Sequence, residues 1–184
     1  MKNEDREHSK FLSYVLRHKP EALGLSLDKA GWAGVDELIG KAREHGRELD
    51  RRVLERVVAE NKKQRFCFNE DHSKIRANQG HSVRVDLGLE PQDPPDVLFH
   101  GTATGFLSKI MEQGLLAKGR HHVHLSVELE QAREVGRRHG KPVILRVDAH
   151  QMVVDGYIFY LSRNGVWLTE FVESHYLLPL DLDI

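Results

Sequence analysis

The stretch EPQDPPD, residues 90–96, divides the sequence into two parts with different patterns. It holds three prolines in five residues, and proline continues neither a helix nor a central strand because it lacks a backbone N–H. We therefore place a domain boundary here, with one domain in residues 1–90 and a second in residues 91–184. The length of 184 residues allows this, because domains of roughly 50–200 residues are common.

The part before this stretch predicts three helices followed by a β-hairpin. Apolar residues recur at helical spacing in three segments, and Asp50 is placed to cap the third. The expected helices cover residues 11–18, 36–42 and 51–58, and the expected strands cover residues 65–68 and 74–76. This order is that of a winged helix, a fold of nucleic-acid binders and of protein-interaction modules, so it leaves function open.

The part after the stretch alternates short strands with two helices. The expected strands cover residues 97–99, 122–126, 143–147, 157–161 and 166–172, and the expected helices cover residues 106–111 and 129–139. Gly114 closes the first of these helices, and Asn164-Gly165 forms a hairpin turn between the last two strands. We expect an α+β domain built on a mixed or antiparallel sheet.

Composition indicates a globular protein of the cytoplasm. The chain is 40% hydrophobic and 30% charged, which is enough apolar material for a core. No stretch approaches the roughly 20 apolar residues that span a bilayer, and the first residues hold no apolar signal core. The single cysteine, Cys67, suits a reducing compartment. We expect a cytoplasmic protein with no membrane partner, and no feature of the sequence demands more than a monomer.

The charge distribution leaves room for a local anion site. The formal net charge of −1 argues against indiscriminate binding to nucleic acid. Residues 1–86, however, hold 18 lysines and arginines against 15 acidic residues, whereas the remainder holds 9 against 13. The first part is therefore the basic one.

Common nucleotide-binding loops and metal clusters are not indicated. No G-x-G-x-x-G follows a strand and no phosphate loop occurs, so neither a Rossmann fold nor a P-loop is expected. In the stretch RHHVHLS, residues 120–126, His122 and His124 share a strand face, which suggests zinc. No carboxylate or cysteine stands at ligand spacing, so we expect no metal.

Several motifs are ambiguous when each is taken alone. The triplet His100-Gly101-Thr102 follows an apolar strand, where glycine lets a ligand approach the backbone, yet its threonine is equally suited to cap a helix. The basic end of the first helix, Arg17-His18-Lys19, is explained by the helix dipole. Arg65 and Arg120 are equally consistent with exposed surface charges.

Together, these motifs are more specific. HGT after a strand, then R-x-x-V-H-L-S, then NGVWLT at residues 164–169 resembles the ADP-ribosyltransferase domain of the RNA 2′-phosphotransferase family. The first part is similar to that family too, in the stretches SKFLSYVLRHKP (9–20), GW (31–32), KQRF (63–66) and RANQGHS (76–82). The resemblance covers roughly residues 9–177.

The resemblance implies a reaction and a set of residues. Family members transfer an internal RNA 2′-phosphate to NAD in two steps, which gives 2′-hydroxyl RNA, nicotinamide and ADP-ribose 1″,2″-cyclic phosphate. The family's catalytic tetrad falls on Arg17, His18, Arg65 and Arg120. Its NAD-binding triad falls on His100, His124 and Val166. Relatives in organisms that splice tRNA act on the phosphate left at the splice junction.

Three further residues are expected to contact the substrates. By analogy with related transferase folds, the Gly101 backbone receives the nicotinamide carboxamide. The hydroxyls of Thr102 and Ser126 are candidates for hydrogen bonds to phosphate or ribose.

The residue types suit this chemistry. A phosphate monoester carries a charge of about −1.5 to −2, so it attacks without a general base and needs only to be held in line. Arginines grip phosphate in a bidentate manner, whereas a carboxylate at the position of Val166 would repel it. The second step requires proton transfer, for which His18 is the candidate acid or base.

Two alternatives stay open. The first is an ADP-ribosyltransferase that modifies nucleic-acid phosphate ends or protein and stops after the first step, leaving an ADP-ribose adduct in place of a released cyclic phosphate. The second is a winged-helix regulator with a ligand-sensing domain, which would bind duplex DNA with a steep salt dependence. The near-neutral net charge disfavours the regulator.

Overall fold

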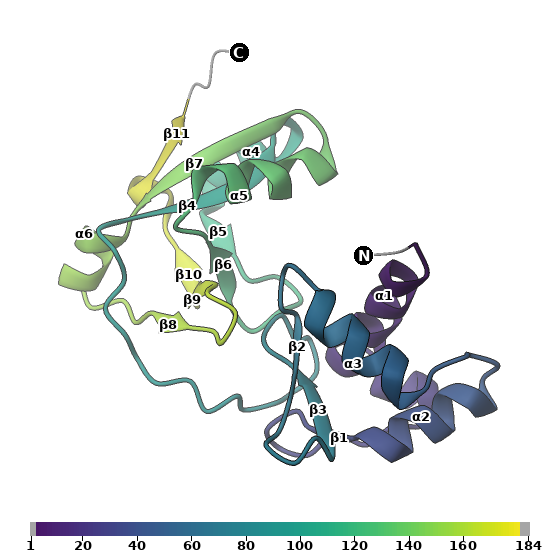
Figure 1. Cartoon of the computed structure of the whole chain (residues 1–184). Helices are drawn as coiled ribbons and strands as arrows, with labels where there is room; N and C mark the ends of the chain where they lie inside the picture. The colour runs from purple at the N-terminus through teal and green to yellow at the C-terminus, as the bar shows by residue number, and fades with distance from the viewer. Residues whose placement is uncertain (1–2, 181–184) are drawn as a thin grey trace. The chain divides into compact units, whose positions relative to one another are not determined.

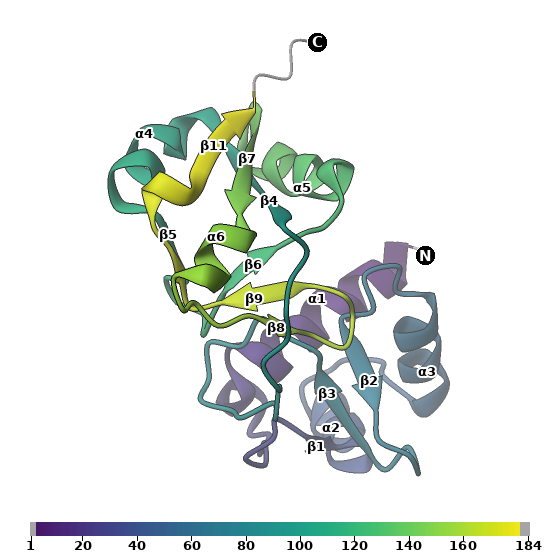
Figure 2. The same cartoon turned by 90° about the vertical axis from the view of Figure 1, so that its left-hand side faces the viewer.

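The computed structural model describes residues 3–180, with the backbone alone for Asn3. The chain divides into two compact units, the first ending at Gly88 and the second beginning at Leu89. Both units combine helices with small antiparallel sheets (Figures 1 and 2), so the mixed helix-and-strand character expected from the sequence is confirmed.

Three helices and one antiparallel sheet make up the first unit. The helices are α1 (Asn3–Arg17), α2 (Val35–Glu44) and α3 (Arg51–Glu60), with a short 3-10 helix η1 (Pro20–Leu23). The strands are β1 (Ala33–Gly34), β2 (Phe66–Phe68) and β3 (Lys74–Ala77), in the order β1-β3-β2. The predicted helices and hairpin are confirmed, whereas β1 was not predicted because it has only two residues. The winged-helix assignment stays a prediction.

Local side-chain bonds explain the boundaries of these elements. The Asp50 carboxylate accepts the Val53 N–H at 2.8 Å and caps α3 as predicted. In the turn between β2 and β3, the Asn69 side chain accepts the Lys74 N–H at 2.8 Å. The Asp71 side chain accepts the Ser73 N–H at 2.9 Å. These bonds close the hairpin that carries β2 and β3.

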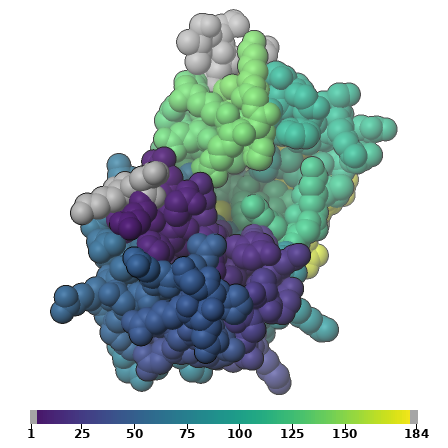
Figure 3. All heavy atoms as spheres, turned by 90° about the vertical axis from the view of Figure 1, so that its right-hand side faces the viewer, coloured from purple at the N-terminus to yellow at the C-terminus, as the bar shows by residue number. Residues whose placement is uncertain are grey.

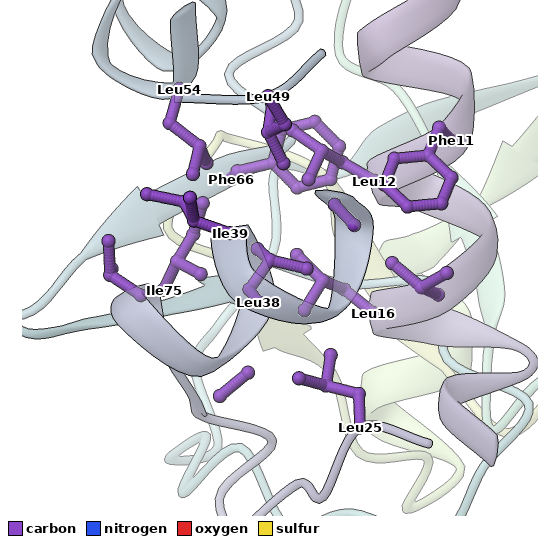
Figure 4. Packing of buried hydrophobic residues seen from close by; sticks show 14 of the residues in the cluster. Phe11, Leu12, Leu16, Leu25, Leu38, Ile39, Leu49, Leu54, Phe66 and Ile75 are labelled. Atoms are coloured by element: carbon purple, nitrogen blue, oxygen red, sulfur yellow. The ribbon is translucent and has the colours of Figure 1, made fainter. Parts of the chain in front are cut away.

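The core of the first unit draws one or more apolar side chains from each main element. Figure 4 shows Leu12 and Leu16 of α1 facing Leu38 of α2, with Phe66 and Ile75 of the hairpin beside them. All five are buried. In Figure 3 the purple-to-blue surface belongs to the helical part of this unit. Burial of this apolar face holds the helices against the sheet.

The second unit is built from three small antiparallel sheets and three helices. The helices are α4 (Thr104–Gln113), α5 (Leu129–Gly136) and α6 (Ala149–Val154), with 3-10 helices η2 (Arg137–His139) and η3 (Ser174–Tyr176). The strands are β4 (Val97–Ala103), β5 (Leu115–Leu116), β6 (Val123–Leu125), β7 (Pro142–Asp148), β8 (Tyr160–Leu161), β9 (Trp167–Thr169), β10 (Phe171–Val172) and β11 (Leu177–Leu180). The sheets have the orders β11-β7-β4, β6-β9-β8 and β10-β5.

Three predicted strands and one predicted helix are wrong in extent. The strand expected over residues 97–99 continues to Ala103, so His100, Gly101 and Thr102 lie within β4 and not after it. The strand expected over residues 157–161 begins only at Tyr160, because the Ile158 carbonyl accepts the Thr169 hydroxyl at 3.0 Å in place of a ladder bond. The strand expected over residues 166–172 is two strands, since β9 pairs with β6 and β8 whereas β10 pairs with β5. The helix expected over residues 129–139 ends at Gly136 and continues as η2.

Two glycines let α5 pack closely against β4. A Cβ atom on Gly101 would lie 1.7 Å from the Ala132 carbonyl oxygen, and one on Gly136 would lie 2.4 Å from the Thr102 carbonyl oxygen. No side chain fits at either position unless the helix moves away from the strand. Gly101, which was predicted to let a ligand approach, therefore has a packing role as well.

Within residues 3–180, no helix combines the length and the apolar character that crossing a bilayer requires.

We predict that Gly101→Ala lowers the free energy of unfolding by about 3 kcal/mol, because the added methyl group forces α5 away from β4. Gly105→Ala is the matched control, since a Cβ atom there meets nothing within 4 Å. It should leave stability unchanged or raise it by up to about 1 kcal/mol. Chemical denaturation measures both, and equal stabilities of the two variants would contradict the packing role of Gly101.

Candidate functional site

Arg17 and His18 lie where α1 ends, and the chain returns to them at Ser82. The Ser82 N–H donates to the Arg17 carbonyl at 2.9 Å, and the Ser82 hydroxyl donates to the same oxygen at 3.4 Å. The His18 Nδ1 atom lies 2.9 Å from the Ser82 Oγ atom. A hydroxyl that donates to a carbonyl accepts from the imidazole, so this geometry places a proton on the Nδ1 atom of His18.

Arg65 is held beside Arg17 by hydrogen bonds to main-chain and amide groups. The Arg17 Nη2 atom donates to the Arg65 carbonyl at 3.4 Å, and the Asn78 N–H donates to the same oxygen at 2.9 Å. The Arg65 Nη1 atom donates to the Asn61 Oδ1 atom at 3.3 Å. Arg17 is only 9% exposed, and its guanidinium lies 5.8 Å from the centre of the Phe66 ring. The first unit thus brings together its three predicted catalytic residues.

Asn61 and Ser82 were not predicted as site residues, yet both hold predicted ones in place. Asn61 is 2% exposed, and its Nδ2 atom donates to the Ser9 hydroxyl at 3.0 Å while its Oδ1 atom also accepts the Lys63 N–H at 3.1 Å. Ser82 ends the RANQGHS stretch, so a signal for it was present. Asn61 gave no signal, because its partner Ser9 is 52 residues away in sequence.

In the second unit, His100 and Arg120 both bond to His124. The His100 Nδ1 atom lies 3.1 Å from the His124 carbonyl oxygen, and because a carbonyl only accepts, Nδ1 carries the proton. The Arg120 Nη1 atom donates to the His124 Nδ1 atom at 3.2 Å, so neutral His124 carries its proton on Nε2. Arg120 itself is exposed. Three of the predicted residues of this unit are therefore linked.

The pKa of His100 lies below the ordinary histidine value. Burial of the imidazole is the main cause, and the positive charge of Lys118 lowers the pKa further. The hydrogen bond to the His124 carbonyl acts in the opposite direction. His100 is therefore neutral near pH 7, and its Nε2 atom is an acceptor.

The bond between His100 and His124 also opens an edge of β4. Phe99 and Ser126 exchange two backbone bonds of 2.8 Å, so the main chain of Phe99 points away from β7. Alternation along an antiparallel strand puts the N–H and C=O of Gly101 on that same edge. The same register sets Gly101 opposite His124, whose carbonyl accepts from the His100 ring instead. The polar main-chain groups of Gly101 thus face the edge where pairing with β6 stops.

The other residues predicted to contact the substrates are Thr102, Ser126 and Val166, and they differ in burial and in secondary structure. Thr102 is buried and, two residues after His100 on β4, shares its strand face. Ser126 is half-buried directly after β6. Val166 lies just outside β9, where its N–H donates to the Ser162 hydroxyl at 3.0 Å, so its predicted place within a strand is wrong. Neither threonine of this region caps α4, whose N-cap is Ala103.

His121 and His122 contact other aromatic rings. Among residues 3–180 there is no group of three or more His, Cys, Asp or Glu side chains suited to hold a metal ion. The His122 ring instead makes an edge contact with the Tyr160 ring, with centroids 5.5 Å apart.

Comparison with known proteins identifies the family. The family model described as "RNA 2'-phosphotransferase, Tpt1 / KptA family" matches residues 3–171. The chain belongs to this family. The resemblance inferred from the sequence motifs is therefore confirmed.

Individual members of the RNA 2′-phosphotransferase family are similar to this chain over nearly their whole length. A protein of Acaryochloris marina named "Probable RNA 2'-phosphotransferase" is 56% identical over 173 residues, which are 94% of this chain and 96% of the relative. Proteins of the same name from Agrobacterium fabrum and Pseudomonas fluorescens are 57% and 53% identical. They cover 92% and 94% of this chain, and 91% and 95% of their own lengths.

Replacing Asn61 should weaken both stability and turnover. We predict that Asn61→Ala lowers the free energy of unfolding by about 1–3 kcal/mol, because Ser9 loses a buried partner, and lowers 2′-phosphotransferase turnover about tenfold, because Arg65 loses its amide contact. Asn69→Ala removes the same side chain from the hairpin turn and serves as the control, with a stability loss but normal turnover. Normal turnover in Asn61→Ala would restrict Asn61 to a structural role.

The protonation state of His100 gives a second prediction. A long-range ¹H–¹⁵N correlation spectrum at pH 7 should show neutral His100 protonated on Nδ1, with a midpoint below the usual ~6.5. Because the pKa of His100 is lower in the folded chain than in the unfolded chain, the unfolded chain is protonated at a higher pH. The stabilisation that neutral His100 provides is therefore complete above pH ~6.5 and is lost as the pH falls. His100→Gln keeps an N–H donor but does not titrate, and should flatten that acid slope. A doubly protonated ring at pH 7 would refute this description.

Proposed function

We propose that the chain removes an internal 2′-phosphate from RNA by transferring it to NAD in two steps. The products are 2′-hydroxyl RNA, nicotinamide and ADP-ribose 1″,2″-cyclic phosphate. Membership of the RNA 2′-phosphotransferase family supports the phosphate transfer. The observation that carries the proposal is the contact of the Arg17 guanidinium with the main chain of Arg65, beside His18 at the end of α1. Arginine side chains hold a phosphate, and an imidazole supplies the proton that a leaving oxygen needs. The first unit is then the winged-helix lobe that holds the RNA phosphate, and the second is the ADP-ribosyltransferase-like lobe that holds NAD.

The arginines bind and orient the phosphate. A phosphate monoester carries a charge of about −1.5 to −2 near neutral pH, so it needs no general base to act as a nucleophile. Arg17 and Arg65 are fixed by hydrogen bonds to a carbonyl and an amide, which orient a guanidinium without cancelling its charge. Arg120, on the second unit, is the third arginine of the proposed set.

The second unit fits a nicotinamide riboside on two counts. The Gly101 N–H and C=O face one edge of β4, which matches the acceptor and donor of a carboxamide. The His100 Nε2 atom is an acceptor for a ribose hydroxyl. NAD supplies the ribose carbon that receives the phosphate when nicotinamide leaves.

The neighbours of His100 and Gly101 complete the proposed NAD site. His124, Thr102 and Ser126 are the further proposed polar contacts, from β6, β4 and the bridge after β6. Val166 presents a neutral side chain, which avoids repelling the incoming phosphate.

His18 carries out the proton transfer of the second step. Imidazole exchanges protons near neutral pH, and the contact with Ser82 fixes which ring nitrogen faces its substrate. The arginines stabilise the charge that develops on the phosphoryl oxygens, each contributing about 3–4 kcal/mol by comparison with an oxyanion donor.

An RNA oligonucleotide with one internal 2′-phosphate, incubated with and without NAD, tests this function. We expect 2′-hydroxyl RNA and the cyclic phosphate only when NAD is present. A retained ADP-ribose adduct would identify an ADP-ribosyltransferase that stops after the first step. Unchanged RNA in the presence of NAD would refute the proposal.

Substitution of arginines should distinguish the proposed catalytic residues from an arginine of the exposed surface. We predict that Arg65→Ala and Arg120→Ala lose at least about a hundredfold in turnover, because each removes a group that holds the phosphoryl oxygens. His18→Ala should accumulate ADP-ribosylated RNA. Arg52→Ala, at an exposed position of α3, is the control and should retain normal turnover. Full activity of Arg65→Ala would overturn the residue assignment even if the reaction is correct.

A further inference from the structure

The chain between α3 and β2 reaches Arg65 through a tight turn. The Gln64 N–H donates to the Asn61 carbonyl at 2.7 Å, and the Lys63 N–H donates to the Asn61 side chain at 3.1 Å. These two bonds close the turn over residues 61–64. Arg65 follows directly and stands one residue before β2, so the conformation of Gln64 sets the direction in which the Arg65 main chain leaves the turn.

Gln64 has a backbone conformation that is costly for its residue type. Its φ of 41° lies in the left-handed region, which residues with a Cβ atom rarely adopt. The Gln64 side chain is exposed, so packing of that side chain does not account for the conformation. Unfavourable backbone conformations persist only where surrounding contacts hold them, and they concentrate at functional sites. A contact to the main chain of Gln64 is therefore needed.

Asn78 supplies that contact from the end of β3. Its Nδ2 atom donates to the Gln64 carbonyl at 2.5 Å, and its backbone N–H donates to the Arg65 carbonyl at 2.9 Å. The strand register ends one residue earlier, at the pair of Phe66 and Ala77. Asn78 thus binds the two consecutive carbonyls that precede β2.

Stability alone does not explain a buried asparagine at this position. Asn78 is 5% exposed, and within residues 3–180 its Oδ1 atom is buried without a hydrogen-bond partner. Burial of an unpaired amide oxygen costs free energy that burial of an apolar side chain would not. The hydrogen bond to Gln64 is therefore the contribution that distinguishes Asn78 from an apolar residue.

We propose that Asn78 is a positioning residue for Arg65, which acts by holding Gln64 in its left-handed conformation. This proposal rests on the proposed function, in which Arg65 grips the 2′-phosphate. A guanidinium binds phosphate in a bidentate manner only when its plane is correctly oriented. The bond to Asn61 fixes the far end of the Arg65 side chain, whereas Asn78 fixes the main chain from which that side chain starts.

The test is steady-state kinetics on the full chain, with NAD and an RNA oligonucleotide that carries one internal 2′-phosphate varied in turn. We expect Asn78→Ala to raise the KM for RNA about tenfold and to leave the KM for NAD unchanged, because Arg65 keeps its charge but loses its orientation. A smaller folded fraction would lower the apparent turnover but change neither KM. The KM for RNA therefore distinguishes positioning from a purely structural role.

Two substitutions at Gln64 test the backbone conformation directly. Gln64→Val should raise the KM for RNA as Asn78→Ala does, because a β-branched residue strongly disfavours a positive φ. Glycine adopts a positive φ readily, so Gln64→Gly combined with Asn78→Ala should have a lower KM for RNA than Asn78→Ala alone. The Gln64 variants keep the proposal testable if Asn78→Ala does not fold.

His72→Val is the matched control, because His72 lies in the turn of the same hairpin with a φ of 57°. It should lower stability and leave both KM values unchanged. A wild-type KM for RNA in Asn78→Ala or Gln64→Val, or no recovery in the double variant, would overturn the positioning role and leave the proposed function intact. Wild-type protein that removes no 2′-phosphate in the presence of NAD would overturn the proposed function, and the positioning role with it.

Discussion

The hydrogen bond from the His100 ring to the His124 carbonyl is the interaction on which the second unit's candidate site depends. It takes the place of the next backbone bond between β4 and β6, so the main-chain groups of Gly101 stay on an unpaired edge. The same bond fixes the tautomer of His100, and burial keeps the ring neutral. One side-chain contact thus leaves both a ring nitrogen that accepts and a main-chain edge without strand pairing.

The rigidity of β4 makes this bond effective. Seven residues of β4 pair with β7, and the close contact of α5 through Gly101 and Gly136 holds the other side of the strand. A strand fixed in this way cannot shift toward β6 to recover the missing ladder bond. The packing of β7 and α5 against β4 therefore offsets the free energy that the unpaired main-chain groups cost. This is the arrangement expected where a ligand completes the pairing.

Hydrogen bonds to neutral partners position the charged groups of the first unit. Ser82 binds the carbonyl of Arg17 and contacts His18, while Asn61 binds the guanidinium of Arg65. Neutral donors and acceptors orient a charged side chain and preserve its charge for a ligand. Both units thus hold candidate catalytic groups through contacts to backbone and amide groups.

Local signals account for what the sequence predicted correctly. The cap at Asp50, the three helices of the first unit and the hairpin that follows them depend on neighbours within a few residues, and all are confirmed. The strand expected over residues 157–161 failed because a side chain, Thr169, replaces a ladder bond from 11 residues away. Asn61 was missed for the same reason, since its role depends on Ser9. The motifs identified the family correctly, whereas the roles of the individual residues stay predictions.

The fate of the phosphorus atom tests the central claim most directly. An RNA oligonucleotide with a radiolabelled internal 2′-phosphate, incubated with the protein and NAD, follows that atom from substrate to product. The account predicts that the label leaves the RNA in ADP-ribose 1″,2″-cyclic phosphate, with one nicotinamide released for each phosphate removed. Label released as inorganic phosphate, or removed from RNA without consumption of NAD, would contradict it.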